Sequence, residues 1–377
     1  MRVVAMLVVL LGTACTYEPF DADPSVAGDD DDQALLAFEP MVSTDAAREP
    51  LSGLIPEINS PQRWSFAVIS DLHLPNPRSA VIDRTVSALI AMGVRLVVVT
   101  GDHTNGSAGV DHRRRRVNAW WASVTGALEP LRDAGIPVLP IAGNHDTYLA
   151  WQREGFENAF ADLDRWAAPL EVHPATGRGF ARAPYSYSVD VDGVHLALAN
   201  IVDQSVDRDV ATWLADDLAS AASARVRIVF GHVPLFSVIR RPARGFVEQL
   251  GTILARGNAE LYVAGHEHLS WDETFTIGAG EALRQVTVGC ASGFYVFAPS
   301  KAARARAACE PSGHGRSSCT MPNGGRFELV RDRSQRMIEH DAATFTVFTV
   351  NGDDVQVIPM TIGDDGQASA FYLEPQS

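Results

Sequence analysis

The sequence predicts an α/β fold in which parallel strands alternate with helices. Five short apolar runs have the length and β-branched content of buried strands, and amphipathic stretches lie between them. Each run is followed at once by a cluster of polar residues. Because the carboxyl ends of parallel strands share one edge of a sheet, we expect these clusters to meet there.

The elements follow from the spacing of apolar residues. The strands are predicted at 66–69, 96–99, 138–141, 226–230 and 261–264, and the helices at about 78–92, 114–134, 151–168, 209–223 and 244–256. Two hairpins, 185–191 with 194–201 and 345–350 with 355–361, are predicted around Asp192-Gly193 and Asn351-Gly352. Trp120 and Trp121 are predicted to face the core.

The composition, with 46% hydrophobic and 20% charged residues, is typical of a soluble globular protein. Much of the formal net charge of −15 comes from residues 16–60, which contain eleven acidic residues and one basic residue, Arg48. Residues 15–61 are predicted to be a disordered tether, 62–365 a catalytic domain and 366–377 a tail. Within the domain, the polar segment 297–342 is predicted to be an irregular insertion. The domain is only mildly acidic, and nothing indicates a nucleic-acid-binding surface.

Residues 1–14 have the features of an export signal. Arg2 precedes a short apolar stretch that is too short to span a bilayer, and small residues precede Cys15. The segment 11–15 resembles the cleavage box of bacterial lipoproteins, although Gly12 stands where an aliphatic residue is usual. We expect Cys15 to carry lipid and to anchor the protein to a membrane, in the periplasm or at the cell surface. An ordinary signal peptide with a secreted soluble product is the alternative.

The three other cysteines fall into two groups. Cys309 and Cys319 flank a segment rich in glycine and serine and are predicted to form a disulfide, with two free thiols as the alternative. Cys290 ends an apolar run and is predicted to be a buried thiol.

The polar clusters after the five strands contain groups that bind metal ions. In chain order they are Asp71-Leu-His73, Gly101-Asp102, Gly143-Asn144-His145-Asp146, Gly231-His232 and Gly265-His266-Glu267-His268. Oxygen and nitrogen donors without thiolates suit Mn, Fe or Zn, in divalent or mixed-valence form. Seven such donors are more than one ion needs, which predicts two ions. The glycines allow the chain to turn sharply off each strand.

In this order the clusters resemble the pattern D-x-H, G-D, G-N-H-D/E, G-H and G-H-x-H of the calcineurin-like metallophosphoesterase superfamily, over roughly residues 64–296. The resemblance implies a four-layer αββα sandwich with two mixed β-sheets and a metal site at the carboxyl ends of the central strands. It further implies one ion held by Asp71, His73 and His268, a second held by Asn144, His232 and His266, and Asp102 bridging both.

The resemblance also implies a reaction. Hydroxide held by the metal ions would attack the phosphorus of a small phosphoester, and His145 would protonate the departing alkoxide as a general acid. Asp146 is expected to hydrogen-bond the ring of His145 and fix its tautomer. His103 and Arg113 are candidate contacts to substrate. The alternatives are that His103 is an exposed loop histidine and that Arg113 belongs to the solvated start of a helix.

One position separates this chain from the purple acid phosphatases of the superfamily. Those enzymes have a tyrosine three residues after the bridging aspartate, where this chain has Asn105. A generic two-metal phosphoesterase is therefore expected. Two other functions stay open, a phosphodiesterase of cyclic nucleotides, nucleotides or phospholipid head groups, and a non-catalytic, metal-stabilised surface lipoprotein. The sequence does not predict the oligomeric state.

Overall fold

A computed structural model describes the chain from Arg63 to Ala370 with several gaps, and a few residues before it. The described residues are 55, 59–76, 79–107, 114–237, 243–268, 270–277, 281–292, 309–313, 316–320, 326–330 and 343–370. Cys15 and Arg113 lie outside them, as does nearly all of the predicted signal peptide and tether. None of the helices in these ranges is long and apolar enough to cross a bilayer.

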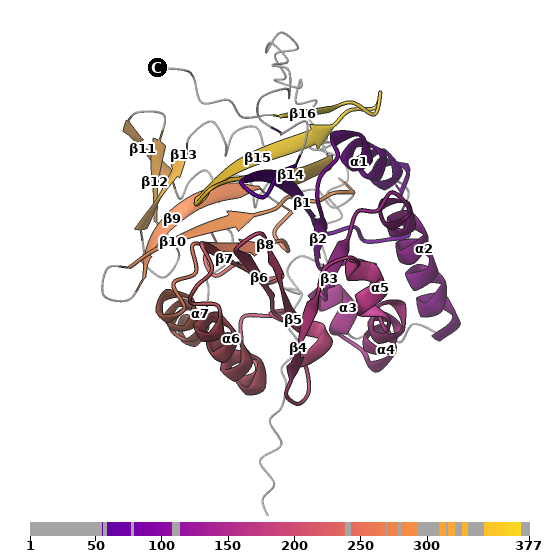
Figure 1. The fold of residues 1–377 in the computed structure, drawn as a ribbon, viewed down its shortest axis with the longest axis horizontal. Coiled ribbons are helices and arrows are strands. Elements are labelled where there is room, and N and C mark those ends of the chain that lie inside the picture. Colours follow the sequence, from indigo (N-terminus) through magenta and orange to yellow (C-terminus); the bar gives the residue numbers. More distant parts are fainter. Residues whose placement is uncertain are drawn as a thin grey trace, which may run out of the picture. The chain divides into compact units, whose positions relative to one another are not determined.

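Two mixed β-sheets form the centre of the fold (Figure 1). Across the first sheet the strands are β16 (Ala368–Ala370), β15 (Asp354–Ile362), β14 (Ala343–Asn351), β1 (Arg63–Ile69), β2 (Val97–Thr100) and β3 (Val138–Ile141). Across the second sheet they are β4 (Val172–Thr176), β5 (Arg182–Val191), β6 (Val194–Leu198), β7 (Val226–Phe230), β8 (Leu261–Ala264), β10 (Glu281–Thr287) and β9 (Trp271–Ile277).

The parallel strands lie in the middle of each sheet. In the first sheet β1, β2 and β3 are parallel, and in the second β6, β7, β8 and β10 are parallel, whereas the remaining pairs are antiparallel. The five predicted strands are thus confirmed and are divided between the two sheets. Both predicted hairpins are confirmed as β5–β6 and β14–β15.

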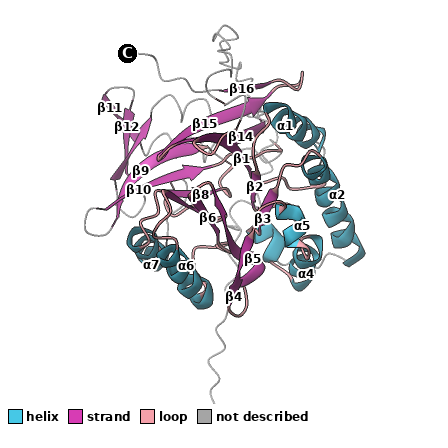
Figure 2. Cartoon of the chain, in the orientation of Figure 1, coloured by secondary structure: helices cyan, strands magenta, loops and turns pink. Residues whose placement is uncertain are grey.

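Helices lie on either side of the sheets (Figure 2). They are α1 (Ser79–Met92), α2 (Arg114–Asp133), α3 (Asn144–Thr147), α4 (Ala150–Ala159), α5 (Leu163–Ala167), α6 (Arg208–Ser220) and α7 (Arg244–Arg256). The single helix predicted over 151–168 is wrong, because the chain breaks between α4 and α5. Asp162 begins the second helix, where its side chain accepts a hydrogen bond from the backbone N–H of Arg165, 3.2 Å.

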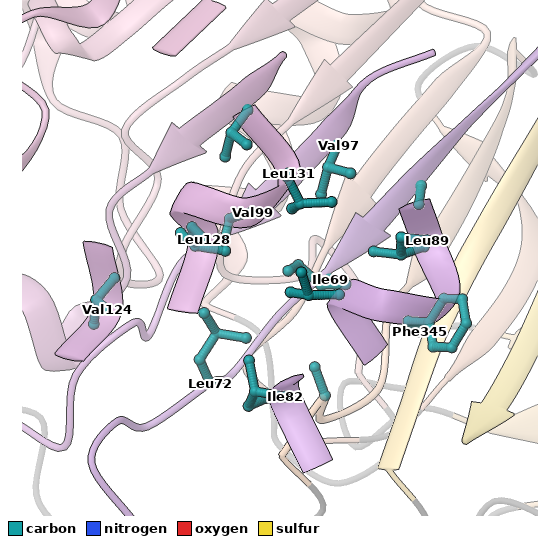
Figure 3. Close-up of a cluster of buried hydrophobic side chains, with 14 of the residues drawn as sticks. Ile69, Leu72, Ile82, Leu89, Val97, Val99, Val124, Leu128, Leu131 and Phe345 are labelled. Carbon is teal, nitrogen blue, oxygen red and sulfur yellow. The ribbon is translucent and has the colours of Figure 1, made fainter. Parts of the chain in front are cut away.

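The outer faces of the two sheets are covered by different helices. On the six-stranded sheet, Ile69 and Val99 pack in one cluster with Leu89 of α1 and Leu128 of α2 (Figure 3). Trp120 and Trp121 of α2 belong to this cluster and are buried, as predicted. On the seven-stranded sheet, a second buried cluster joins Val229 of β7 to residues of α6 and α7.

The inner faces of the two sheets pack on each other. Phe66 of β1 stacks on Phe348 of β14, with ring centroids 4.8 Å apart, and meets the edge of Phe230 from the other sheet at 6.3 Å. These rings belong to a buried apolar cluster drawn from both sheets. Helices, sheet, sheet and helices therefore form a four-layer αββα sandwich, and the fold that the resemblance implied is confirmed.

Two segments differ from the prediction. The segment 297–342 is not wholly irregular, since it contains a three-stranded antiparallel sheet of β11 (Cys309–Gly313), β12 (Arg316–Thr320) and β13 (Arg326–Val330). The sequences of β11 and β12 lack apolar alternation, so their pairing leaves no pattern to find. The first sheet also continues past residue 365, because β16 pairs with β15. Cys309 lies opposite Cys319 in the β11–β12 register, and their disulfide stays a prediction.

Candidate metal centre

Each polar cluster begins at the carboxyl end of a strand. Asp71 and His73 follow β1, Asp102 follows β2, and Asn144 opens α3 directly after β3. The two remaining clusters follow β7 and β8 of the other sheet. Because the two sheets pack face to face, their loops meet at one end, and the structure brings together all seven residues predicted as metal ligands: Asp71, His73, Asp102, Asn144, His232, His266 and His268.

One group of ligand atoms comes from Asp71, His73 and His268. The Nε2 atoms of the two histidines lie 3.2 Å apart. The Oδ1 atom of Asp71 lies 3.2 Å from Nε2 of His268 and 3.8 Å from Nε2 of His73. The side chains of Asp71 and His73 are almost completely buried. Three donors thus face a common point at the edge of the first sheet.

A second group comes from Asn144, His232 and His266. The Oδ1 atom of Asn144 lies 2.9 Å from Nε2 of His232 and 2.9 Å from Nδ1 of His266. These two ring nitrogens are themselves 3.2 Å apart. The other ring nitrogen of His232 donates a hydrogen bond to the carbonyl oxygen of Thr100, 2.8 Å, which orients the imidazole.

Asp102 lies between the two groups. Its Oδ2 atom is 3.2 Å from Nε2 of His232 and 3.9 Å from Nε2 of His73. Its Oδ1 atom accepts a hydrogen bond from the backbone N–H of His145, 2.9 Å. The carboxylate is buried, with 1% of its side chain exposed. Among the described residues, Asp102 is therefore the side chain placed to serve both groups.

The donor set suits cations. Among the described residues, three groups of Asp and His side chains have ligand atoms within 4.8 Å of one another, and Asp102 belongs to two of these groups. In each half of the site two imidazole nitrogens face each other at 3.2 Å beside a side-chain oxygen. Lone pairs that converge on one point in this way are stabilised by a positive ion, and the donors are all oxygen or nitrogen.

The carboxylates are held ready to bind a cation. Burial would raise the pKa of Asp71, but His268 and His232 outweigh it and hold the pKa below its ordinary value. Burial also acts against ionisation of Asp102, whose pKa is nevertheless held well below its ordinary value by His232 and His145. Both acids are therefore ionised at neutral pH.

The two central histidines differ in charge. Burial lowers the pKa of His73 to about 3, and its ring is neutral and able to donate a lone pair. Burial would also lower the pKa of His232, but the adjacent Asp102 and Asp71 raise it to about 9. His232 is therefore protonated at neutral pH in the metal-free chain.

The backbone at the site is strained. Five of the seven predicted ligands have left-handed φ angles: Asp71 (56°), His73 (46°), Asp102 (51°), His266 (70°) and His268 (54°). A non-glycine residue in this region costs on the order of 1–3 kcal/mol. Such strain persists only where the surrounding structure over-determines it, and here it turns each side chain off the end of its strand into the pocket.

Two glycines allow the loops to approach each other. A Cβ atom on Gly143 would lie 2.2 Å from the backbone N and from Oδ1 of Asp102. A Cβ atom on Gly265 would lie 1.8 Å from Oγ of Ser70 and 2.8 Å from Oδ2 of Asp71. The glycines before the ligands thus keep the backbone close to the site, as the sequence predicted.

His145 lies beside the pocket, with 27% of its side chain exposed. Its Nδ1 atom hydrogen-bonds the carbonyl oxygen of Gly106, and its Nε2 atom lies 3.8 Å from Oδ2 of Asp102. The prediction that Asp146 accepts a hydrogen bond from this ring is wrong. The sequence cannot show that the loop after β2 carries the Gly106 carbonyl back to α3.

Asp146 binds the loop after β2 instead. Its buried carboxylate accepts hydrogen bonds from the backbone N–H groups of Gly143 (3.0 Å), His103 (3.1 Å) and Thr104 (3.0 Å), and lies 2.9 Å from Nδ1 of His103. Asp146 therefore fastens the loop that carries Asp102 to the helix that carries Asn144.

The side chain of His103 lies in the protein interior. Its side chain is completely buried, and its ring packs against Trp121, Phe156 and Phe160, at centroid distances of 5.7, 5.8 and 5.4 Å. Burial in this aromatic cluster disfavours the predicted contact with substrate. The other candidate contact, Arg113, lies outside the described residues.

Two residues near the site were not predicted, Gly106 and Tyr148. Tyr148 follows Asn144 by four residues, the spacing that brings side chains together on a helix, and this spacing was the signal in the sequence that could have identified it.

The prediction that Cys290 is a buried thiol is confirmed. Its Sγ atom lies 3.2 Å from the carbonyl oxygen of Asp71, behind the pocket.

Residues 65–270, more than half of the chain, match the model of the calcineurin-like phosphoesterase family. The chain belongs to this family. The family resemblance read from the sequence is confirmed. No curated protein shows significant similarity to the chain.

Several solved structures are similar. The purple acid phosphatase PPD1 of yellow lupin is 16% identical, with a TM-score of 0.51, over 84% of this chain and 54% of that one. GAP50, the anchor in the inner membrane complex of Plasmodium, is 14% identical over 82% of this chain and 87% of that one, TM-score 0.45. A phosphatase of Mycoplasma pneumoniae is 13% identical over 79% and 94%, TM-score 0.39. The chain spans about half the length of the lupin enzyme, and this likeness shows the shared fold alone.

Metal binding to the metal-free protein is expected to release protons. His232 must lose its proton before Nε2 can bind an ion, and its pKa is raised to about 9. Affinity is therefore expected to weaken as the pH falls below about 9 and to level off above it. Calorimetric titration with Mn²⁺ or Zn²⁺ at pH 7, in two buffers of different ionisation enthalpy, is expected to show release of about one proton or more. Equal binding enthalpies in both buffers would contradict this assignment.

Proposed function

We propose that this protein hydrolyses phosphoesters with two metal ions held in the pocket. The observation that carries the proposal is the convergence of seven oxygen and nitrogen donors from five strand ends, with Asp102 placed between the two groups. Two groups that share a single carboxylate have the arrangement of a dinuclear site. Membership of the calcineurin-like phosphoesterase family supports the reaction class.

The proposed ligands follow the geometry. Asp71, His73 and His268 would hold one ion, and Asp102 would bridge it to a second. The second ion would be held by the group that comprises Asn144, His232 and His266. Mn, Fe or Zn suits these donors. When bound, the ions would polarise the phosphoryl oxygens and would lower the pKa of a water molecule, so that the hydroxide it forms can attack phosphorus.

Among the protein groups, His145 is proposed as the general acid. The hydrogen bond from Nδ1 to the Gly106 carbonyl oxygen leaves Nε2 as the nitrogen that exchanges a proton at the pocket. Nε2 lies near Asp102, and the ring is partly exposed, so that a substrate can reach it. In this position His145 would donate its proton to the departing alkoxide oxygen. Asp146 acts indirectly, by holding the loop after β2 in place.

Two variants separate metal binding from proton transfer. Asp102→Asn is expected to reduce metal content and to abolish hydrolysis, because the bridging carboxylate loses its charge. His145→Ala is expected to lower kcat by about 100-fold or more while the metal content stays at the wild-type level. The measurements are elemental analysis of the purified variants and steady-state kinetics. The control is His173→Ala, which changes a histidine on β4 that is 46% exposed. Wild-type turnover in both site variants would refute the mechanism.

The substrate is proposed to be a small phosphoester. A panel that includes nitrophenyl phosphate and bis(nitrophenyl) phosphate is expected to show metal-dependent hydrolysis, with faster turnover of the monoester. Equal or faster turnover of the diester would assign the protein to the phosphodiesterases. No turnover above the metal-free control for any ester would leave a metal-stabilised surface lipoprotein as the explanation.

Export and lipid attachment are proposed from the sequence alone. The motif that ends at Cys15 would place a lipid on the mature N-terminus and hold the protein at a membrane. Cys15→Ser, expressed with its own signal, is expected to move the protein from the membrane fraction to the soluble exported fraction. Unchanged membrane association of the variant would exclude this anchor.

A further inference from the structure

Tyr148 lies next to two functional residues of the proposed site. It follows α3 directly, and its backbone N–H donates to the carbonyl oxygen of Asn144, 3.1 Å, so that the helical turn continues through it. Residues four apart on such a turn lie on one face. Accordingly, Nδ2 of Asn144 donates a hydrogen bond to the hydroxyl oxygen of Tyr148. The edge of the tyrosine ring also packs against His145, with ring centroids 5.4 Å apart and an interplanar angle of 63°.

The amide of Asn144 has to be oriented before it can bind a metal ion. Its oxygen and nitrogen ends have almost the same shape, but only the oxygen has a lone pair to offer. In the structure Oδ1 faces Nε2 of His232 and Nδ1 of His266. Once these nitrogens direct their lone pairs at an ion, they can no longer donate to the amide oxygen. The hydrogen bond at the other end of the amide then has to keep the oxygen directed into the pocket.

We propose that Tyr148 is a positioning residue for the second metal ion. Its hydroxyl holds Nδ2 of Asn144 and thereby directs Oδ1 toward the ion, while its ring packs against the ring of His145 and restrains it. This inference rests on the proposed function for the existence of the second ion. Tyr148 lies outside the five motifs, and the motifs give it no role.

His145 has a second restraint, which makes the two roles of Tyr148 separable. The Gly106 carbonyl fixes Nδ1 of His145 whether or not the tyrosine ring is present. Loss of the hydroxyl alone therefore leaves both restraints on His145, whereas loss of the whole ring removes one of them. Tyr148→Phe tests the effect of the hydroxyl on metal binding, and Tyr148→Leu tests the hydroxyl together with the contact of the ring to His145.

The first experiment is metal titration of metal-stripped protein. Wild type and Tyr148→Phe are dialysed against a series of free Mn²⁺ concentrations, and bound metal is counted by elemental analysis. The Asn144 site is expected to be the weaker of the two, because it has a neutral amide oxygen where the other site has the carboxylate of Asp71. In Tyr148→Phe the concentration that half-fills this weaker site is expected to rise about tenfold, the lower end of what loss of a supporting hydrogen bond to a ligand costs. The tighter site is expected to fill as in wild type. This readout does not depend on any activity.

The matched control is Tyr187→Phe. Tyr187 is completely buried between the sheets, and its hydroxyl donates to the carbonyl oxygen of Pro140, 2.8 Å. This variant also loses one phenol hydrogen bond, and it is expected to melt at a lower temperature with both metal midpoints unchanged. A shift of the weaker midpoint in Tyr148→Phe alone supports the proposal. Equal midpoints in wild type and Tyr148→Phe overturn it, whatever the change in melting temperature.

Kinetics at saturating metal test the ring. Tyr148→Phe is expected to recover kcat to within about threefold of wild type once the weaker site is filled, because its ring still contacts His145. Tyr148→Leu is expected to keep a kcat deficit of about tenfold or more at the same metal occupancy. Full recovery in Tyr148→Leu overturns the restraint on His145. If the wild-type protein binds two ions but hydrolyses no phosphoester, the proposed function fails, and the metal midpoints still decide the role of the hydroxyl.

Discussion

The carboxylate of Asp102 is the contact on which the two halves of the site depend. One of its oxygens lies 3.2 Å from His232, which follows a strand of the seven-stranded sheet, and 3.9 Å from His73, which follows a strand of the six-stranded sheet. The other oxygen holds the backbone of His145. This contact requires the two sheets to pack in one relative position. The buried apolar cluster between the sheets, in which the ring of Phe66 meets that of Phe230, provides that constraint.

The arrangement is costly for the protein by itself. Two carboxylates and several imidazoles are buried together, and five of the ligands have a left-handed backbone. Burial of ionised groups is unfavourable unless they are paired, and each left-handed residue adds on the order of 1–3 kcal/mol. Asp102 and His232 offset part of this cost by pairing as opposite charges. Bound cations would replace the proton on His232 and neutralise both acids, so that the same strain serves metal binding.

The sequence predicts the parts of this protein that repeat a local pattern. An apolar run followed by a polar cluster marks each of the five strand ends, with a glycine before the ligand in four of them, and therefore the cluster from Asp71 to His268 could be found without the structure. The partners of those residues could not. Gly106 reaches His145 through a loop that has no motif, and His103 is buried by aromatic rings from two helices. Such contacts depend on tertiary packing, as does the pairing of the polar strands β11 and β12.

The central claim is that the five strand ends build one pocket for two ions. Crystals grown with Mn²⁺ and measured at the manganese absorption edge test it most directly, because anomalous scattering locates each ion independently of activity. The account predicts two peaks, one beside Asp71, His73 and His268 and one beside Asn144, His232 and His266, with Asp102 between them. A single peak, or peaks that leave Asp102 without contact to both, would contradict it.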